Sequence, residues 1–245
     1  MSDPHGAVSG SLLPNVVELA LERLHPMLVA DAARCPEELQ RAFFKLVAAI
    51  LLHHWKHFVP SGIRGRAAAL AAQTGGSASA GPSSPHGAAH FIRLLQTIGS
   101  SLESAEISPS LLRCNLACLD RLHAAHNLFS RPEFAGDGLR LQFLKTLFLI
   151  LLRRSHELLR EEVTNTIHSM VSVDFDGFHG DFLFAFLTEA TVLADGEKQQ
   201  LLEGFSTDRD IPSFNASVQR FVNDFVFFAA KRSSVDSGGG FVPPR

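Results

Sequence analysis

Tyrosine is absent from the sequence and tryptophan occurs once, whereas phenylalanine occurs 20 times. Aromatic surfaces that stack nucleic acid bases are normally accompanied by an excess of basic residues. That excess is missing, because 22 Lys and Arg stand against 25 Asp and Glu, a formal net charge of −3. We therefore expect the aromatic residues to pack between helices, and the charge indicates neither a nucleic acid nor an anionic membrane surface as partner.

Cysteine is also scarce, with Cys35, Cys114 and Cys118 as the three in the sequence. They are too few for a disulfide framework, and their odd number fits a reducing compartment. The first ten residues lack the basic and apolar parts of a signal peptide. The most apolar run, 147–152, is far shorter than the roughly 18 residues that suggest a membrane span. These absences predict an intracellular protein without membrane insertion.

Apolar residues are abundant, at 46% of the sequence, which is enough for a folded core. Near the end of the chain they recur in steps of four, three, four and three, which predicts one buried face of a helix. Asp210 stands just before this stripe and Pro212 lies in its first turn, where both suit the start of a helix. The stripe consists of Phe214, Val218, Phe221, Phe225 and Phe228.

Helical periodicity extends along most of the chain, and beyond one short segment no strand pattern is convincing. We expect about nine helices in successive pairs of about 40 residues, which is within the range of HEAT repeats. The expected fold class is therefore all-α, a HEAT-repeat-like α-solenoid of antiparallel helix pairs. The first expected helix is 12–30, with Pro26 as a kink or an end. The second is opened by Pro36, Glu37 and Glu38 and is apolar on several faces, which include Leu39 and Leu46. The others are 91–102, a helix capped by Ser108 and Pro109, 139–152, a helix started by Ser155 and Glu157, 182–193, 197–205 and 212–230.

The expected organisation has five parts. Residues 1–11 and 231–245 are predicted to be disordered ends, 12–60 a HEAT-like helix pair, 61–89 a flexible insertion, and 90–230 the carboxy-terminal HEAT-like repeats. The insertion is rich in Gly, Ser, Ala and Pro, so it has too little apolar surface to offset the entropy of ordering. It is either a tolerated linker, which we favour, or a regulated or partner-binding loop.

An acidic turn at Asp174 and Asp176 is the strongest suggestion of catalysis. The pattern Asp-x-Asp-Gly after an apolar segment resembles the nucleophile loop of haloacid-dehalogenase-type phosphatases, in which the first Asp attacks phosphorus. Only helices are predicted to follow, so the alternating strands that would supply a Lys and magnesium-binding carboxylates are missing. A calcium loop also fails, because His179 and Ala185 stand where Gly and Glu are required. We favour a turn that caps the next helix.

Two groups of potential metal ligands remain. His53 and His57 are four residues apart on one predicted helix face, but the Glu of a catalytic zinc motif is replaced by His54 and no third ligand is evident. The second group sits on one predicted helix and lacks the loop that separates ligand pairs in zinc fingers. We expect no catalytic, cofactor-binding or metal-ligating residues, and we interpret 160–162 as a solvated charged face. The second group consists of Cys114, Cys118, His123 and His126.

The last helical stripe lies in a distinctive motif, 210–214 (DIPSF) followed by 218–224 (VQRFVND). Further motifs lie upstream, at 51–58 (LLHHWKHF), 155–162 (SHELLREE) and 170–178 (MVSVDFDGF). Together they resemble the carboxy-terminal part of nuclear export receptors of the importin-beta (karyopherin) superfamily, within it the exportin-6 family. The resemblance runs from about Leu12 to about Phe228 and is dense from Arg140 onward.

This resemblance implies part of a nuclear export receptor in nucleus and cytoplasm, without enzymatic activity or cofactor. It implies Ran-GTP, a protein cargo that in this family is profilin-actin, and nucleoporins as partners of the full-length receptor. Cargo and Ran would favour the same curvature of the superhelix, so each would tighten the binding of the other. The amino-terminal repeats that hold Ran in this superfamily are missing, so we expect a fragment or a shortened relative. The alternatives are a Ran-independent helical-repeat scaffold and, remotely, the phosphatase.

Deleting Gly75 to Ser84 should leave the melting temperature nearly unchanged, because this part of the insertion offers almost nothing to bury. Thermal unfolding followed by circular dichroism measures the effect. A large drop in the melting temperature would show that the segment is ordered and packed.

Overall fold

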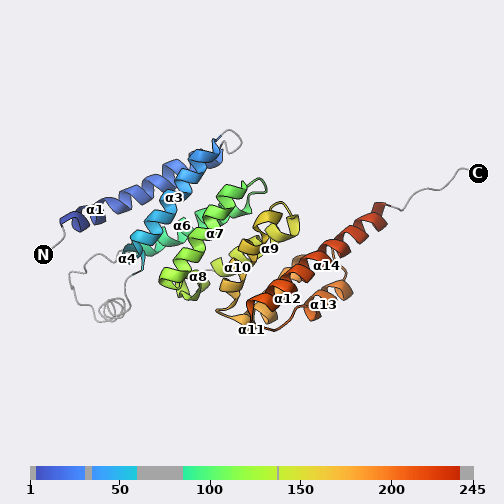
Figure 1. Cartoon of the computed structure of the whole chain (residues 1–245). Helices are drawn as coiled ribbons and strands as arrows, with labels where there is room; N and C mark the ends of the chain where they lie inside the picture. The colour runs from blue at the N-terminus through green and yellow to red at the C-terminus, as the bar shows by residue number, and fades with distance from the viewer. Residues whose placement is uncertain (1–3, 31–34, 60–84, 137, 238–245) are drawn as a thin grey trace, which may run out of the picture. The chain divides into compact units, whose positions relative to one another are not determined.

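The computed structural model describes residues 4–30, 35–59, 85–136 and 138–237, and within these ranges every regular element is a helix (Figure 1). The all-α prediction is therefore confirmed. The chain divides into two compact units, residues 1–137 and 138–245. None of the helices in the described ranges combines the length and apolarity that crossing a membrane requires. Most of the predicted insertion, residues 60–84, lies outside the described residues.

The first unit is organised around α3 and α7, which pack against each other and against α6. Ser108 caps α7 as predicted, because its Oγ accepts a hydrogen bond from the backbone N–H of Leu111 at 3.2 Å and Pro109 follows at the first helical position. The elements are α1 (Pro4–Leu19), η1 (Ala20–Leu24), α2 (His25–Ala30), α3 (Glu37–His53), α4 (Trp55–Phe58), α6 (Pro85–Glu103), α7 (Pro109–His126), η2 (Leu128–Ser130) and α8 (Pro132–Gly136).

The starts of α3 and α7 are tied together by Glu37. Its carboxylate accepts hydrogen bonds from the hydroxyl groups of Ser108, at 2.9 Å, and of Ser110. These hydrogen bonds lower the pKa of Glu37, and the bond from Ser110 has the larger effect. The same acidic side chain lies in the first turn of α3, where the helix dipole also favours a negative charge.

Several predicted helix boundaries in this unit are corrected by the structure. The first helix begins at Pro4 rather than near residue 12, and α6 begins at Pro85 within the predicted insertion. Pro26 does not end the first helical segment. A π-helical turn, η1, directly precedes α2, in which Pro26 stands, and such a turn is one way to accommodate a residue that lacks a backbone N–H.

The expectation that α3 is enclosed on several faces holds only in part. Phe43, Val47 and Ile50 are buried, whereas Leu39 and Leu46 are exposed. A helix with one buried face and scattered apolar residues on the other is ordinary for a protein surface.

The second unit is built from α9, α10 and α14 together with a shorter pair, α12 and α13. α10 packs on α9 and α14, while α13 packs on α12 and α14 (Figure 1, yellow to red). The elements are α9 (Leu139–Arg153), η3 (Glu157–Leu159), α10 (Arg160–Val171), α11 (Phe175–Gly177), η4 (Phe178–Phe182), α12 (Leu183–Glu189), α13 (Asp195–Glu203) and α14 (Ile211–Ser237).

A cluster of phenylalanine rings fills the core of the second unit. Phe148 of α9 lies at its centre, with ring centroids 5.6 to 6.1 Å from those of Phe178, Phe182, Phe186 and Phe221. Offset and edge-to-face aromatic pairs at such distances add about 0.5–1.5 kcal/mol each beyond the burial of their area. The abundance of phenylalanine is thus explained by helix packing, as the sequence predicted.

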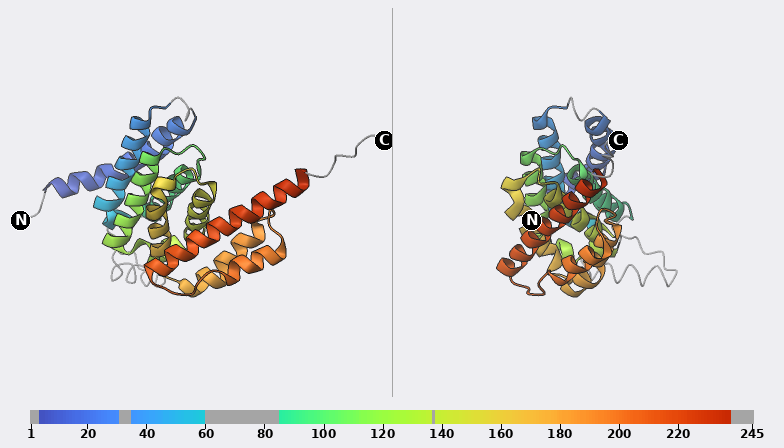
Figure 2. Two further views of the ribbon diagram at one scale, coloured as in Figure 1. Left: turned by 45° about the vertical axis from the view of Figure 1, so that its right-hand side comes forward. Right: turned by 90° about the vertical axis from the view of Figure 1, so that its right-hand side faces the viewer.

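Helix α14 carries the predicted stripe, and its start is as expected, because Asp210 Oδ1 accepts a hydrogen bond from the Ser213 N–H at 2.9 Å. The first three members of the stripe are buried. Phe225 and Phe228 are only half-buried, so the prediction of a fully buried stripe is wrong at its end. The helix also continues to Ser237, beyond the predicted end at residue 230, and its carboxy-terminal half extends past α12 and α13 (Figure 2).

Replacing Phe221 by Ala should destabilise the second unit by about 3–5 kcal/mol, because the ring is buried and contacts the rings of Phe148 and Phe205. Denaturant unfolding gives the magnitude, and hydrogen exchange locates the damage. Protection of backbone amides from exchange should fall in 138–237 and be kept in 12–58. The reason is that each repeat contacts mainly its neighbours, so the damage should not spread to distant repeats.

Phe227→Ala is the matched control, because Phe227 is on the same helix with 63% of its surface exposed. This variant should change the free energy of unfolding by no more than about 0.5 kcal/mol. Uniform loss of protection in Phe221→Ala would instead indicate one cooperative domain.

Candidate functional site: an apolar groove at the end of the aromatic core

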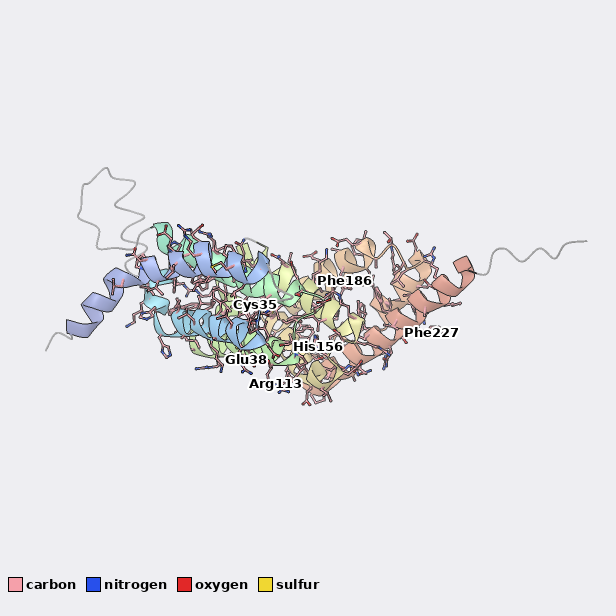
Figure 3. The ribbon with its side chains drawn as sticks, turned by 90° about the horizontal axis from the view of Figure 1, so that it is seen from above. Cys35, Glu38, Arg113, His156, Phe186 and Phe227 are labelled. Atoms are coloured by element: carbon pink, nitrogen blue, oxygen red, sulfur yellow. The ribbon has the colours of Figure 1, made fainter. Side chains whose placement is uncertain are left out.

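A groove of about 380 Å³ lies in the second unit, between α9, α12 and α14. Its apolar lining consists chiefly of Leu149 and Leu152 from α9, Phe186 from α12, Val192 from the turn after α12, and Phe225 from α14. Figure 3 marks Phe186 on α12. The rings of Phe186 and Phe225 are 6.5 Å apart, so the groove is a continuation of the aromatic core.

The groove exists because the helices around it differ in length. The helical run that ends with α12 spans 175–189, about 22 Å, whereas α14 has 27 residues, about 40 Å. Phe214, Val218 and Phe221 are covered, but α12 ends before it can cover Phe225. The stripe of α14 therefore reaches the surface while still apolar.

The turn after α12 is held by its own hydrogen bonds. The Thr191 N–H donates to the carbonyl of Glu189 at 2.9 Å, and the Ala194 N–H donates to Glu197 Oε2 at 2.8 Å, at the start of α13. Leu193 is buried, whereas Val192 has 49% of its surface exposed. The turn therefore places Val192 at the edge of the groove.

Charged side chains stand at the rim of the groove. Lys145 of α9 forms an ion pair with Glu189 at the end of α12, and Arg153 stands in the last turn of α9. The next residue, Arg154, adopts a left-handed conformation (φ 54°) that ends α9. Its guanidinium donates to Asn223 Oδ1 of α14 at 2.7 Å, which joins the end of α9 to α14 beside Phe225.

The acidic turn at Asp174 is a helix cap, as favoured from the sequence. Asp174 Oδ1 accepts a hydrogen bond from the Gly177 N–H at 3.0 Å, while its Oδ2 pairs with Arg140 at 2.9 Å. Asp176 pairs with Arg209 at 3.0 Å. A Cβ at Gly177 would lie 2.4 Å from Asp174 Oδ2, so a larger residue there would displace the capping carboxylate. Each carboxylate is thus matched to an arginine.

The three histidines 53, 54 and 57 do not share one continuous helix, which corrects the sequence interpretation. α3 ends at His53, His54 has non-helical dihedral angles (φ −113°, ψ 26°), and α4 begins at Trp55. Burial and, after it, the neighbouring His90 and His54 lower the pKa of His57. Within the described residues no group of three or more His, Cys, Asp or Glu side chains is arranged to hold a metal ion.

The second potential metal group, which consists of Cys114, Cys118, His123 and His126, makes packing contacts in the first unit. Burial, and secondarily Cys114, raises the pKa of the Cys118 thiol to about 12. His123 stacks on Phe129 with ring centroids 4.4 Å apart, and His126 stacks on Trp55 at 4.2 Å. Cys118 is buried, whereas Cys114, His123 and His126 are half-buried, so the prediction of buried residues holds fully only for Cys118.

Comparison with known proteins places the chain in a family. The family described as "Exportin-6, C-terminal TPR repeats" matches residues 51–231. The chain belongs to this exportin-6 family. It is 32% identical over 226 residues to Exportin-6-A of Xenopus laevis, covering 92% of this chain, and 31% identical over 233 residues to Exportin-6 of Mus musculus, covering 95% of it. A more distant relative is Exportin-6 of Dictyostelium discoideum, 24% identical over 219 residues and 89% of this chain.

The matches have two further features. This exportin-6 family chain spans 18 to 19% of the length of those relatives. No solved structure matches the chain. The TPR repeats named in the family description are, like HEAT repeats, helix pairs, which agrees with the all-α fold of the chain.

The groove was not predicted from the sequence, because the whole stripe of α14 was expected to be buried in the core. One signal was present: apolar residues continue around α14 at 225–230 (FVFFAA), which is more than one buried face requires. The lining residues of α9 and α12, in contrast, have the periodicity of ordinary core positions. This exportin-6 family chain brings them together only on folding.

Replacing Asp174 by Ala should lower the free energy of unfolding by about 0.5–2 kcal/mol, because the variant loses the cap on the Gly177 N–H. Asp176→Ala is the matched control. Its carboxylate is 93% exposed and its ion pair with Arg209 is at the surface, so a change of less than about 1 kcal/mol is expected. Urea unfolding compares the two variants.

The Asp174→Asn variant tests catalysis. We expect no magnesium-dependent phosphatase activity in either the wild-type chain or the variant, because the carboxylates serve as a cap and as arginine partners. Activity in the wild type that disappears in Asp174→Asn would support the phosphatase instead.

Proposed function

We propose that this chain is the carboxy-terminal part of a nuclear export receptor that moves between nucleus and cytoplasm. The observation that carries the proposal is the match of residues 51–231 to the carboxy-terminal repeats of exportin-6. The proposed partners are Ran-GTP, profilin-actin as cargo, and nucleoporins. Because the chain spans 19% of relatives such as Exportin-6 of Mus musculus, these partners are proposed for a receptor of their length.

The proposed activity is binding without covalent chemistry. In a stack of helix pairs each repeat contacts mainly its neighbours, so the curvature of the whole can change at low cost. Two ligands that favour the same curvature strengthen each other's binding, and loss of one releases the other. We also propose that the helices in 12–60 and in 90–230 are successive repeats of such a stack.

A second candidate is a helical-repeat scaffold that binds proteins without Ran. The feature that favours it is the all-helical fold of the described residues, since stacked helix pairs form extended surfaces that bind proteins. The two candidates differ in one measurable respect, which is whether cargo binding depends on the nucleotide state of Ran.

A chimeric receptor tests the proposal. In Exportin-6 of Mus musculus, the 233-residue segment that aligns with this chain is replaced by the chain itself. Cells that lack their own exportin-6 receive the chimera, and the nuclear-to-cytoplasmic ratio of fluorescent profilin-actin is measured. We expect the chimera to lower this ratio as the parent does, and a receptor truncated before the segment to fail.

Purified protein provides the second part of the test. Capture of profilin-actin by the chimera should be stronger with Ran-GTP than with Ran-GDP. Equal capture in both states would favour the scaffold. A chimera that is folded by circular dichroism but leaves the nuclear ratio unchanged would contradict the proposed function.

A further inference from the structure

We propose that an exposed apolar face of α1, η1 and α2 packs against the preceding helix pair of a longer export receptor, an inference that rests on the proposed function. This face, which we name the outer stripe, runs along the first helical segment of the first unit. Large apolar side chains that stay exposed together on one helix face mark a surface for contact with another protein. The outer stripe consists of five residues with 38 to 72% of their surface exposed, which are Leu12, Val16, Leu19, Leu24 and Met27.

The outer stripe is continuous because of the π-helical turn η1. Its first three members follow one another in steps of four and three, as residues on one face of an α-helix do. The next step, from Leu19 to Leu24, is five residues. η1 absorbs the extra residue, because the His25 N–H donates to the Ala20 carbonyl, five residues earlier. Met27 then follows by three, so the turn keeps both ends of the stripe on one side of the helix.

Another face of the same helices is already buried in the first unit. η1 packs on α3, and the ring of His25 stacks on that of Phe43 with centroids 6.0 Å apart. Figure 1 shows α1 at the edge of the first unit, with α3 beside it. The buried apolar residues of this face are Leu13, Val17, Ala20 and Leu21.

The first helical segment is therefore apolar on two faces, of which only one is covered. Apolar residues on several faces are typical of a helix that lies between neighbours on both sides. A helix pair that ends a solenoid, in contrast, has a polar outer face that keeps the protein soluble. The outer stripe thus has the character of a contact between repeats.

The matched relatives indicate which partner covers the outer stripe. The match is to carboxy-terminal repeats, and the chain spans 18 to 19% of the length of these relatives. In a receptor of their length, more chain therefore precedes the first unit. Because each repeat of a stack packs on its neighbours, the first helices of the unit are the ones that a preceding helix pair meets.

The charges of the segment favour a protein over a membrane surface as the partner. Amphipathic helices that lie on anionic lipids are rich in Lys and Arg. The charged residues between 12 and 30 are instead Glu18, Glu22 and Arg23, so the segment is acidic. Glu22 is also paired with Arg93 of α6 at 2.6 Å, which directs its carboxylate to the first unit.

Hydrogen exchange in the chimeric receptor tests the inference. This chain replaces the aligned segment of Exportin-6 of Mus musculus, as in the export experiment. Exchange of the backbone amides in 12–30 is measured in the chimera and in the isolated chain. We expect exchange to be about tenfold or more slower in the chimera, because an uncovered end element opens at low free-energy cost and a packed neighbour raises that cost. Equal rates would overturn the proposal.

A matched pair of leucine variants tests which surface is covered. Leu19 lies in the middle of the outer stripe with 53% of its surface exposed, and Leu39 lies on α3 with 54% exposed. Leu19→Asp should abolish the slower exchange in the chimera, because packing would bury an unpaired carboxylate. Leu39→Asp should keep it. Both isolated variants should fold by circular dichroism, since both positions are exposed. Equal effects in the chimera would contradict the assignment of the outer stripe.

Met27→Asp tests the alignment across η1. Met27 has 72% of its surface exposed and lies beyond the π-helical turn. If the turn keeps the stripe continuous, Met27→Asp should abolish the slower exchange as Leu19→Asp does. Exchange that stays slow would show that the stripe ends before the turn, which would overturn the proposal. If the Leu19→Asp chimera does not fold, Met27→Asp and the comparison of the wild-type proteins decide the outcome.

Other occupants of the outer stripe would be recognised with the isolated chain. A dimer in sedimentation velocity that is lost in Leu19→Asp but kept in Leu39→Asp would show that a second copy covers the stripe. Binding to vesicles of phosphatidylcholine and phosphatidylserine with the same dependence would identify a membrane surface. Either result would overturn the proposal.

The exchange and export measurements fail independently. A chimera that slows exchange in 12–30 but does not lower the nuclear ratio of profilin-actin would contradict the proposed function alone. A chimera that lowers the ratio without slowing exchange in 12–30 would contradict this inference alone.

Discussion

The packing of Phe148 against Phe221 is the interaction on which the second unit depends. The two rings meet edge to face with centroids 5.7 Å apart, one from α9 and the other from α14. Rings from η4 and α12, which follow each other directly, surround the same centre, so three separate parts of the sequence are held by one cluster. With tyrosine absent, these rings bring no hydroxyl groups into the core that would need hydrogen-bond partners.

The groove is a consequence of this same core. A phenylalanine stripe on a long helix can be buried only as far as its neighbours extend, and α12 ends at Glu189. Phe225 of α14 is left half-buried beside Leu149 and Leu152 of α9. Since an exposed apolar patch bordered by charges is a common feature of binding surfaces, the unit is suited to binding proteins.

The acidic turn between α10 and α12 shows how a motif typical of catalysis can cap a helix and join neighbouring elements. Asp174 caps the next helix and pairs with Arg140, while Asp176 pairs with Arg209, whose guanidinium also lies 5.5 Å from the centroid of the Phe175 ring. Each group is used in joining elements of one helical unit. Spacing in a sequence therefore suggests chemistry, but the partners of each carboxylate decide it.

Local periodicity was sufficient to predict the all-α class, the caps at Ser108 and Asp210 and the buried stripe up to Phe221, because these depend on residues within a few turns of one another. The interruption of the helix at His54 was not predictable in this way, whereas a helix that continues through Pro26 was one of the two outcomes predicted there. The groove was the least accessible feature. It depends on the relative lengths of α12 and α14 and on which helices become neighbours, and both are decided only when distant segments pack together.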